Sequence, residues 1–324
     1  MLLWFIVAVS VCLFIAYYYL RDTRKPPFIA SEVQAYTFID PADPSKSYPF
    51  PSLFSPAEKS LSVIVPAYNE EKRLPKMLEE TIKSLEARTR RSPSFSWEII
   101  VVDDGSRDGT VEAAYHCGGY LGTDKFRVLR LSKNSGKGAA VKSGMLSSRG
   151  ELLLMADADG ATYFEDYLKL ERKLGTEYKE KAIIAIGSRA QLEQAERSFI
   201  RKLFMWGFHW YVNLIGGVQH IHDTQCGFKL FTREAARLVF PNQHLARWAF
   251  DVELLYVAQQ YSIPIYEVAV KWSEVPGSKL HIWKAVLNMS RDLLNMRCKY
   301  WLGIWCLYNY RATENSVVKN GAYQ

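Results

Sequence analysis

Cysteine, glycine and proline are all scarce in this chain of 324 residues. Its five cysteines are scattered without a CxxC spacing, which argues against a disulfide scaffold and a structural zinc site and favours a reducing compartment. Glycine and proline fill only 32 positions (19 and 13), and 48% of the residues are hydrophobic. This composition excludes collagen, a coiled coil and a mostly disordered protein.

A large excess of one charge is also lacking, since the net charge is only +7. A balance of this size suits an anionic membrane surface or a phosphorylated substrate. We therefore expect no nucleic-acid partner.

Long hydrophobic runs are limited to one, at residues 2–20, where no residue is charged and Ser10 is the one clearly polar residue. As a helix, such a run would measure about 28 Å, close to the thickness of the hydrocarbon core of a bilayer. The alternative is a cleaved signal peptide. However, no Lys or Arg precedes the run, and Tyr17, Tyr18 and Tyr19 stand where a cleavage site needs small residues. We predict an uncleaved transmembrane signal-anchor over residues 1–20.

The segments that flank the central part of the chain differ from it in composition. Arg21, Arg24 and Lys25 follow the predicted anchor, so the positive-inside rule places the rest of a single-pass chain in the cytosol. Residues 21–60 hold seven of the thirteen prolines, which predicts a basic, mostly extended linker. Residues 276–324 are predicted to form an amphipathic helical segment at the membrane interface, with a buried core helix as the alternative.

Residues 61–275 alternate between short apolar runs and helix-like stretches. This alternation predicts βαβ units and an α/β fold with a mostly parallel sheet covered by helices, whose ligands bind where the strands end. Strands are expected at 61–65, 98–103, 126–131, 151–157 and 182–187, and helices at 70–90, 108–116 and 137–148.

Two of the predicted strands end in carboxylates, Asp103 and Asp104 in one case and Asp157 and Asp159 in the other. One such loop would be ordinary turn chemistry, but two at one edge of a sheet indicate a cation that offsets their repulsion. Hard oxygen ligands favour Mg²⁺ or Mn²⁺, and the absence of nearby His and Cys argues against zinc.

A glycine-rich stretch, "NSGKGAAVKSG" (134–144), places Lys137 between two glycines where a helix is predicted to begin. Exposed backbone amides and a lysine at this place suit a phosphate. The spacing is not that of a Walker A loop, and a solvated helix start is the alternative.

The motifs together resemble glycosyltransferase family 2, and the resemblance covers about residues 61–272. It rests on "VPAYNEE" (65–71), "VVDDGS" (101–106), "NSGKGAAV" (134–141) and "MADADG" (155–160), which occur in the family's order. It implies the GT-A, or Rossmann-like, fold and a nucleotide-sugar donor. "DADGAT" (157–162), "DTQCGFKLF" (223–231) and "RWAFDVELLY" (247–256) are similar to the branch that transfers glucose from UDP-glucose to dolichyl phosphate at the endoplasmic reticulum membrane.

The resemblance also implies roles for individual residues. Asp157 and Asp159 match the catalytic pair whose metal, Mg²⁺ or Mn²⁺, bridges the donor diphosphate. Attack by the lipid phosphate would invert the sugar and give a β-linked product used in lipid-linked oligosaccharide assembly and N-glycosylation. The other matches are donor-binding residues Pro66, Tyr68, Glu70, Asp103, Asp104 and Lys137, and acceptor-phosphate residues Arg189 and Arg201.

Several alternatives stay open. A related mannosyltransferase using GDP-mannose is one, although Ala161 and Lys229 depart from the mannosyl pattern. A processive polysaccharide synthase is another, but His244 replaces the glutamine of its QxxRW motif and only one spanning segment is predicted. A non-catalytic, membrane-tethered nucleotide-sugar binder is the third. Asp251 or Glu253 could orient groups at the site or form ordinary ion pairs.

Overall fold

The computed structural model describes residues 36–41, 43–176, 178–189, 215–218, 221–275 and 282–310. The predicted anchor (1–20) and Arg201 lie outside these residues. Within the described ranges, no helix is both long and apolar enough to cross a bilayer.

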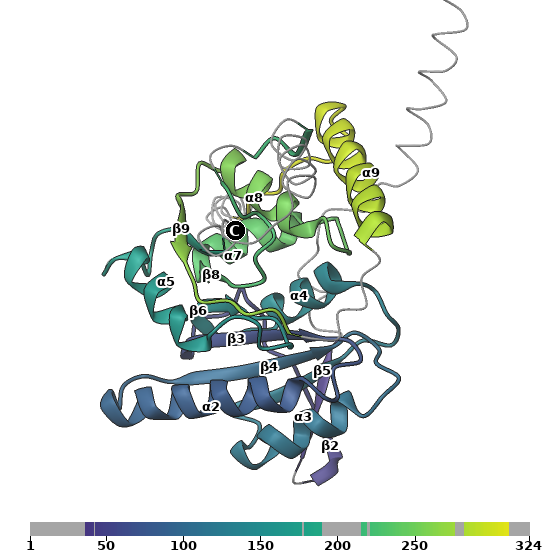
Figure 1. Cartoon of the computed structure of the whole chain (residues 1–324). Coiled ribbons are helices and arrows are strands. Elements are labelled where there is room, and N and C mark those ends of the chain that lie inside the picture. Colours follow the sequence, from purple (N-terminus) through teal and green to yellow (C-terminus); the bar gives the residue numbers. More distant parts are fainter. Residues whose placement is uncertain are drawn as a thin grey trace, which may run out of the picture.

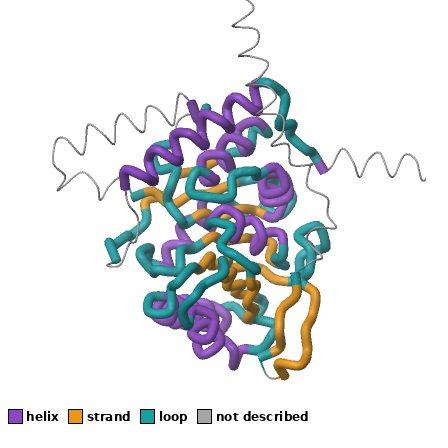
Figure 2. The backbone as a smooth tube through the Cα atoms, turned by 90° about the vertical axis from the view of Figure 1, so that its right-hand side faces the viewer, coloured by secondary structure: helices purple, strands orange, loops and turns teal. Residues whose placement is uncertain are grey.

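A seven-stranded sheet forms the centre of the molecule (Figures 1 and 2). Its strands are β3 Lys59–Ala67, β4 Trp97–Asp103, β5 Phe126–Arg130, β6 Gly150–Met155, β7 Ile184–Ser188, β8 Lys229–Thr232 and β9 Ile265–Ala269. Their spatial order is β5-β4-β3-β6-β8-β7-β9. Only β8 runs antiparallel to its neighbours β6 and β7, so the mostly parallel sheet predicted from the sequence is confirmed.

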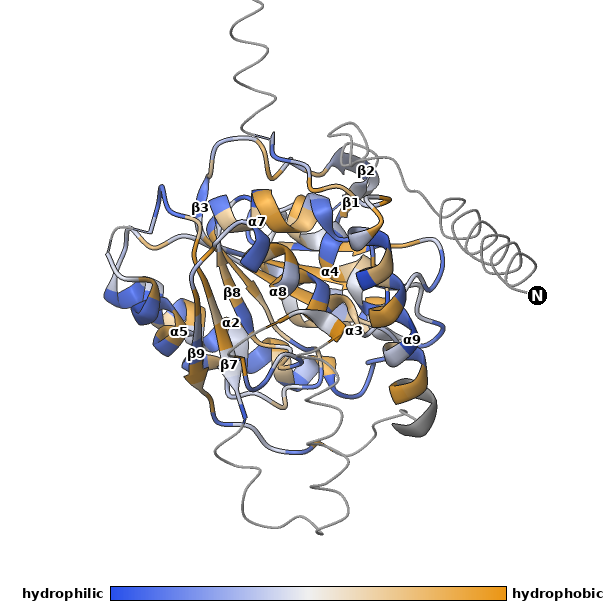
Figure 3. Ribbon diagram, turned by 90° about the horizontal axis from the view of Figure 1, so that it is seen from above, coloured by the Kyte–Doolittle hydropathy of each residue, from blue (hydrophilic) through white to orange (hydrophobic). Residues whose placement is uncertain are grey.

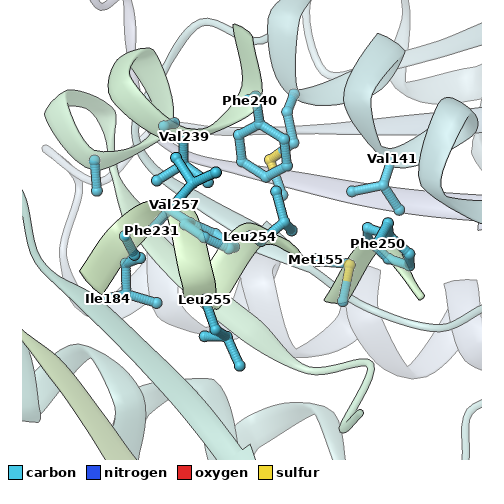
Figure 4. Close-up of a cluster of buried hydrophobic side chains, with 14 of the residues drawn as sticks. Val141, Met155, Ile184, Phe231, Val239, Phe240, Phe250, Leu254, Leu255 and Val257 are labelled. Carbon is cyan, nitrogen blue, oxygen red and sulfur yellow. The ribbon is translucent and has the colours of Figure 1, made fainter. Parts of the chain in front are cut away.

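Helices cover both faces of the sheet (Figure 1). They are α2 Leu74–Arg91, α3 Thr110–Gly118, α4 Lys137–Leu146, α5 Tyr167–Leu174, α7 Arg233–Val239, α8 Phe250–Gln260 and α9 Ile282–Trp301, with 3-10 turns η2 Gly119–Leu121, η3 Phe164–Asp166 and η4 Phe240–Asn242. One apolar core joins α2, α3 and α5 to the sheet, and the other joins α4, α7 and α8 to its opposite face. Figure 4 shows part of the second core, in which side chains of α7 and α8 meet Met155 of β6 and Ile184 of β7.

Strands that are buried on both faces explain the continuous apolar runs of the sequence. All seven residues of β4 are buried, as are the last seven of β3. The predicted strands at 61–65, 98–103, 126–131, 151–157 and 182–187 correspond to β3, β4, β5, β6 and β7.

The segment that precedes the sheet is folded from residue 37 onward, in contrast to the extended linker predicted for residues 21–60. Strands β1 Thr37–Asp40 and β2 Asp43–Pro49 form an antiparallel hairpin with Phe38 opposite Tyr48. Phe38 and Phe50 are buried, and the Arg127 guanidinium lies 5.3 and 5.1 Å from their ring centres. Removal of the two aromatic rings from water stabilises the hairpin against the body. Proline content gives no sign of this packing, so the expectation of an extended linker was wrong here.

The last described helix, α9, has two different faces (Figure 3). Met289, Leu293 and Met296 are buried against the body. Leu287, Leu294 and Trp301 are exposed, the last by 83%, and their spacing of seven residues places them along one stripe. In the following segment Ile304, Trp305 and Tyr310 are buried, so the end of the described chain packs on the core.

Candidate active site

The carboxyl ends of three parallel strands meet at one edge of the sheet. Ala67 of β3 is in register with Asp103 of β4, and Ile64 of β3 is in register with Met155 of β6. The loops that follow these strands are therefore neighbours, at the place where α/β sheets bind ligands.

The two aspartates that follow β6 are partly open to solvent. The Asp157 and Asp159 side chains are 34% and 30% exposed. Asp157 Oδ1 lies 2.6 Å from Lys137 Nζ, and Asp159 Oδ1 accepts the Ala161 N–H at 3.0 Å. Arg73 Nη1 stands 4.0 Å from Asp159 Oδ2. The loop thus presents two carboxylates between two cationic side chains.

These carboxylates suit a hard divalent ion, since both offer oxygen atoms that are partly exposed to solvent. The described part of the chain holds no group of three or more His, Cys, Asp or Glu side chains placed to bind a metal. Ala161 stands where the mannosyl relatives were expected to have a third, polar ligand. Asp157 and Asp159 would therefore hold an ion only together with water or substrate oxygens.

Lys137 is the first residue of α4 and faces Asp157. Burial opposes its charge, but Asp157 and Asp251 outweigh burial and raise the pKa of Lys137. The Trp248 ring, 43% exposed, lies 5.5 Å from Lys137 Nζ. A permanent cation therefore stands at the helix start, next to the pair of aspartates.

Asp104 fixes the shape of the glycine-rich loop. Its carboxylate accepts the N–H of Ser135 at 2.6 Å and the N–H of Gly136 at 2.8 Å. Gly136 has a φ of 103°, which only glycine adopts without strain. Burial raises the pKa of Asp104, and nearby Asp103 adds to the effect. Because two backbone amides occupy its carboxylate oxygens, Asp104 braces the loop that carries Lys137.

The remaining donor-side residues lie on the loops after β3 and β4. Pro66 belongs to buried β3, while Tyr68 is 39% exposed. The Asp103 side chain is 2% exposed and accepts the Ser106 N–H at 3.1 Å. Glu70 is paired with Arg73 at 2.5 Å, and this pairing connects it to the Asp159 side of the site.

A buried ion pair lies behind the aspartates. Lys229 Nζ donates to Asp251 Oδ1 at 2.5 Å and to the Cys226 carbonyl at 2.6 Å, and both side chains are buried. Burial raises the pKa of Asp251 against the opposing effects of Lys229 and Lys137. A role for Asp251 as a solvent-accessible base does not fit this environment.

Arg189 follows β7 and is held by a partner that the sequence analysis did not single out. Its Nε and Nη2 donate to the two oxygens of Asp223, each at 2.8 Å. Although burial opposes ionisation, Arg189 lowers the pKa of Asp223. The Arg189 guanidinium also lies 5.7 Å from the Trp272 ring, and Trp272 bridges to Thr162 in the aspartate loop. Arg189 is thus placed beside that loop, whereas Arg201 lies outside the described residues.

Two other residues were missed in the sequence. Arg73 is the N-cap residue of α2 and stands three residues after Glu70, a spacing that could have signalled their pairing. Gly227 lies against the Asp157 carboxylate so closely that a methyl group there would overlap it. Nothing in the local sequence could have indicated this contact.

Comparisons with known proteins agree with this geometry. The family model described as "Glycosyl transferase family 2" matches residues 62–240. The chain is 53% identical over 267 residues to the Homo sapiens protein named "Dolichyl-phosphate beta-glucosyltransferase", covering 81% of this chain and 82% of that protein. Proteins with the same name from Drosophila melanogaster and Saccharomyces cerevisiae are 48% and 38% identical, over 95% and 93% of this chain and 94% and 93% of theirs.

A solved structure with a similar fold is glucosyl-3-phosphoglycerate synthase from Mycobacterium tuberculosis, in complex with Mn²⁺ and UDP-glucose. It has a TM-score of 0.50 and 17% identity, and the match covers 85% of this chain and 84% of that one. The likeness supports the GT-A-like α/β architecture alone. The family match and the relatives at 38–53% identity show that the chain belongs to glycosyltransferase family 2.

Proposed function

We propose that the chain transfers glucose from UDP-glucose to dolichyl phosphate with inversion, which gives dolichyl β-D-glucosyl phosphate. The chain is an enzyme of family 2, and its relatives at 38–53% identity carry the name of this activity. The observation that carries the proposal is the cluster of Asp157, Asp159 and Lys137 where β6 and α4 meet.

On the donor side, the chain must stabilise a departing nucleoside diphosphate. Lys137 supplies a cation at the start of α4, and Asp104 holds the amide-bearing loop in place. Mg²⁺ or Mn²⁺ held by Asp157 and Asp159 would offset the growing negative charge on the diphosphate by several kcal/mol.

On the acceptor side, the guanidinium of Arg189 suits a phosphate because its planar fork donates two hydrogen bonds. Asp223 accepts from Nε and Nη2 and so holds the guanidinium in one orientation beside the aspartate loop. The phosphate would be bound through other N–H groups of the same guanidinium. A lipid monophosphate has a second pKa of about 6 and is largely a dianion at neutral pH, so its oxygen is already nucleophilic. Asp251 lies on buried α8 and is paired with Lys229. This pairing agrees with a reaction that needs no strong protein base.

The membrane context is also part of the proposal. The exposed stripe of α9, formed by Leu287, Leu294 and Trp301, carries Arg291 beside it, a pattern typical of helices that lie in an anionic interface. Together with the anchor predicted for residues 1–20, this pattern supports the proposal that the catalytic body lies on the cytosolic face of the endoplasmic reticulum membrane.

The test uses the full chain in vesicles that contain dolichyl phosphate, with radiolabelled UDP-glucose or GDP-mannose as the donor. We expect labelled lipid only from UDP-glucose, no product in excess EDTA, and recovery with added Mg²⁺ or Mn²⁺. Transfer from GDP-mannose alone would instead assign the mannosyl activity. Nucleotide binding without any lipid product would assign a binding protein.

A further inference from the structure

A buried carboxylate next to the site connects α9 to the glycine-rich loop. Glu253 of α8 is fully buried. Its Oε2 accepts the backbone N–H of His244 at 2.9 Å and that of Leu245 at 2.6 Å. Its Oε1 accepts the Tyr300 hydroxyl at 3.2 Å and lies 3.1 Å from His244 Nδ1. Because both oxygens are occupied, Glu253 cannot take a proton from a substrate.

The segment that Glu253 holds, residues 243–249, lies directly against the loop that carries Lys137. Ala139 donates its N–H to the Ala246 carbonyl at 3.0 Å, and Gln243 Nε2 donates to the Gly138 carbonyl at 2.8 Å. A methyl group on Gly138 would stand 2.6 Å from the Leu245 carbonyl oxygen. The two backbones therefore touch directly at Ala139 and Gly138, and a shift in one must move the other.

The α9 side of this connection is equally well packed. The Trp305 ring stacks on His244, with ring centres 4.0 Å apart and an angle of 8° between the planes. Tyr300 packs edge-on against Trp305 at 5.4 Å. The position of residues 243–249 thus depends on α9 and the segment after it, as well as on α8.

We propose that Glu253 is a positioning residue: held by Tyr300 of α9, it fixes residues 243–249 against the glycine-rich loop and so sets Lys137 beside Asp157. The inference rests on the proposed function only for the role of Lys137 at the donor diphosphate. A displacement of about 1 Å in such a group lowers a reaction rate by up to about a hundredfold.

The test compares two substitutions that each remove one partly buried hydroxyl from the same junction. Tyr300→Phe removes the hydrogen bond to Glu253 and the 3.3 Å hydrogen bond that the same hydroxyl donates to the Asn242 carbonyl. Tyr261→Phe is the matched control, since the Tyr261 hydroxyl donates to the Tyr308 carbonyl at 2.8 Å and no hydrogen bond joins it to Glu253. We expect similar small losses of thermal stability, but faster hydrogen exchange of the Ala139 amide and about a tenfold loss of transfer only for Tyr300→Phe.

A double-mutant cycle with Lys137→Ala separates positioning from a merely structural role. If Tyr300 and Glu253 act through Lys137, Tyr300→Phe costs no further activity once Lys137 is gone. Equal effects of the two tyrosine substitutions, or full additivity in the cycle, would overturn the proposal. Glu253→Gln is a second variant, expected to reproduce the effect of Tyr300→Phe.

The hydrogen-exchange measurement needs no substrate, so it tests the mechanical link even if the proposed function fails. Absence of glucose transfer by the unsubstituted chain would contradict the proposed function alone. In that case the double-mutant cycle uses UDP affinities measured by calorimetry in place of transfer activities. An unchanged Ala139 exchange rate in Tyr300→Phe would contradict the positioning role alone.

Discussion

Gly227 lies directly against the Asp157 carboxylate, and no residue larger than glycine fits at position 227 unless that carboxylate moves. A Cβ atom at position 227 would overlap both oxygens of Asp157. The overlap is with the far end of a side chain, so the Asp157 carboxylate would move while the backbone stayed in place. The glycine therefore determines where one of the two candidate metal-binding carboxylates points.

Gly227→Ala should lower glucose transfer by about a hundredfold while leaving the fold intact. Transfer and thermal unfolding are measured side by side. Gly119→Ala is the control, because its new methyl group would meet nothing closer than Pro41 Cβ at 3.5 Å and its φ of −60° is ordinary. Full activity of Gly227→Ala would show that the position of Asp157 does not matter.

The Arg189–Asp223 pair predicts an effect on the acceptor. Asp223→Asn keeps the shape of the side chain but weakens its hold on the guanidinium, so we expect the KM for dolichyl phosphate to rise about tenfold. Glu171→Gln is the control, because it weakens a comparable pair with Arg88 on α2 and α5, with N–O distances of 2.6 and 2.8 Å. An unchanged acceptor KM, or an equal loss of UDP affinity, would argue against this role.

Acid stability should depend on Glu98, a fully buried side chain paired with Arg127 and with Arg149. Burial opposes the charge of Glu98, but the two arginines lower its pKa below the ordinary value. A carboxylate whose pKa is lowered by folding stabilises the folded state at pH values above its ordinary pKa. This stabilisation is lost as the pH falls through the lowered pKa.

Glu98→Gln should therefore reduce the free energy of unfolding by about 3–5 kcal/mol at pH 7. The difference from the unsubstituted chain should shrink below about pH 4. Urea unfolding at several pH values measures both quantities. A difference that is the same at pH 7 and at low pH would contradict the assignment.

The exposed stripe of α9 predicts contact with lipid. In anionic vesicles containing doxyl-labelled lipids, Trp301 should account for a large share of the quenched tryptophan fluorescence, and Trp301→Leu should remove that share. Tyr120→Ser is the control, since this 72% exposed aromatic lies in η2, directly after α3, and Figure 1 shows α3 on the opposite side of the sheet from α9. Equal quenching with and without Trp301 would place α9 away from the membrane.

The parts of the fold that the sequence predicted are those with continuous local signals. Strands β3 to β7 are apolar runs between turn residues, so their number and parallel direction could be read directly. Strand β8 was missed because it has four residues and begins with Lys229, whose burial depends on Asp251 far along the chain. Strand β9 was missed because it is a half-exposed edge strand of five residues.

The candidate site also consists of residues with local sequence signals and of contacts that have none. Asp157, Asp159 and Lys137 follow strand ends and a glycine-rich turn, and the structure brings them together. The contacts that orient them could not be predicted, because they join positions distant in sequence. Arg189 and Asp223 are 34 residues apart, and the amides that occupy Asp104 are 31 and 32 residues away.

The two acidic side chains of α8 have a consequence for side reactions. Asp251 is committed to Lys229, and Glu253 to Tyr300 and the backbone. A water molecule that entered in place of the lipid would find neither carboxylate able to accept its proton, whereas an ionised phosphate has no proton to give up. We therefore expect α8 to give no general-base assistance to hydrolysis of the sugar donor by water.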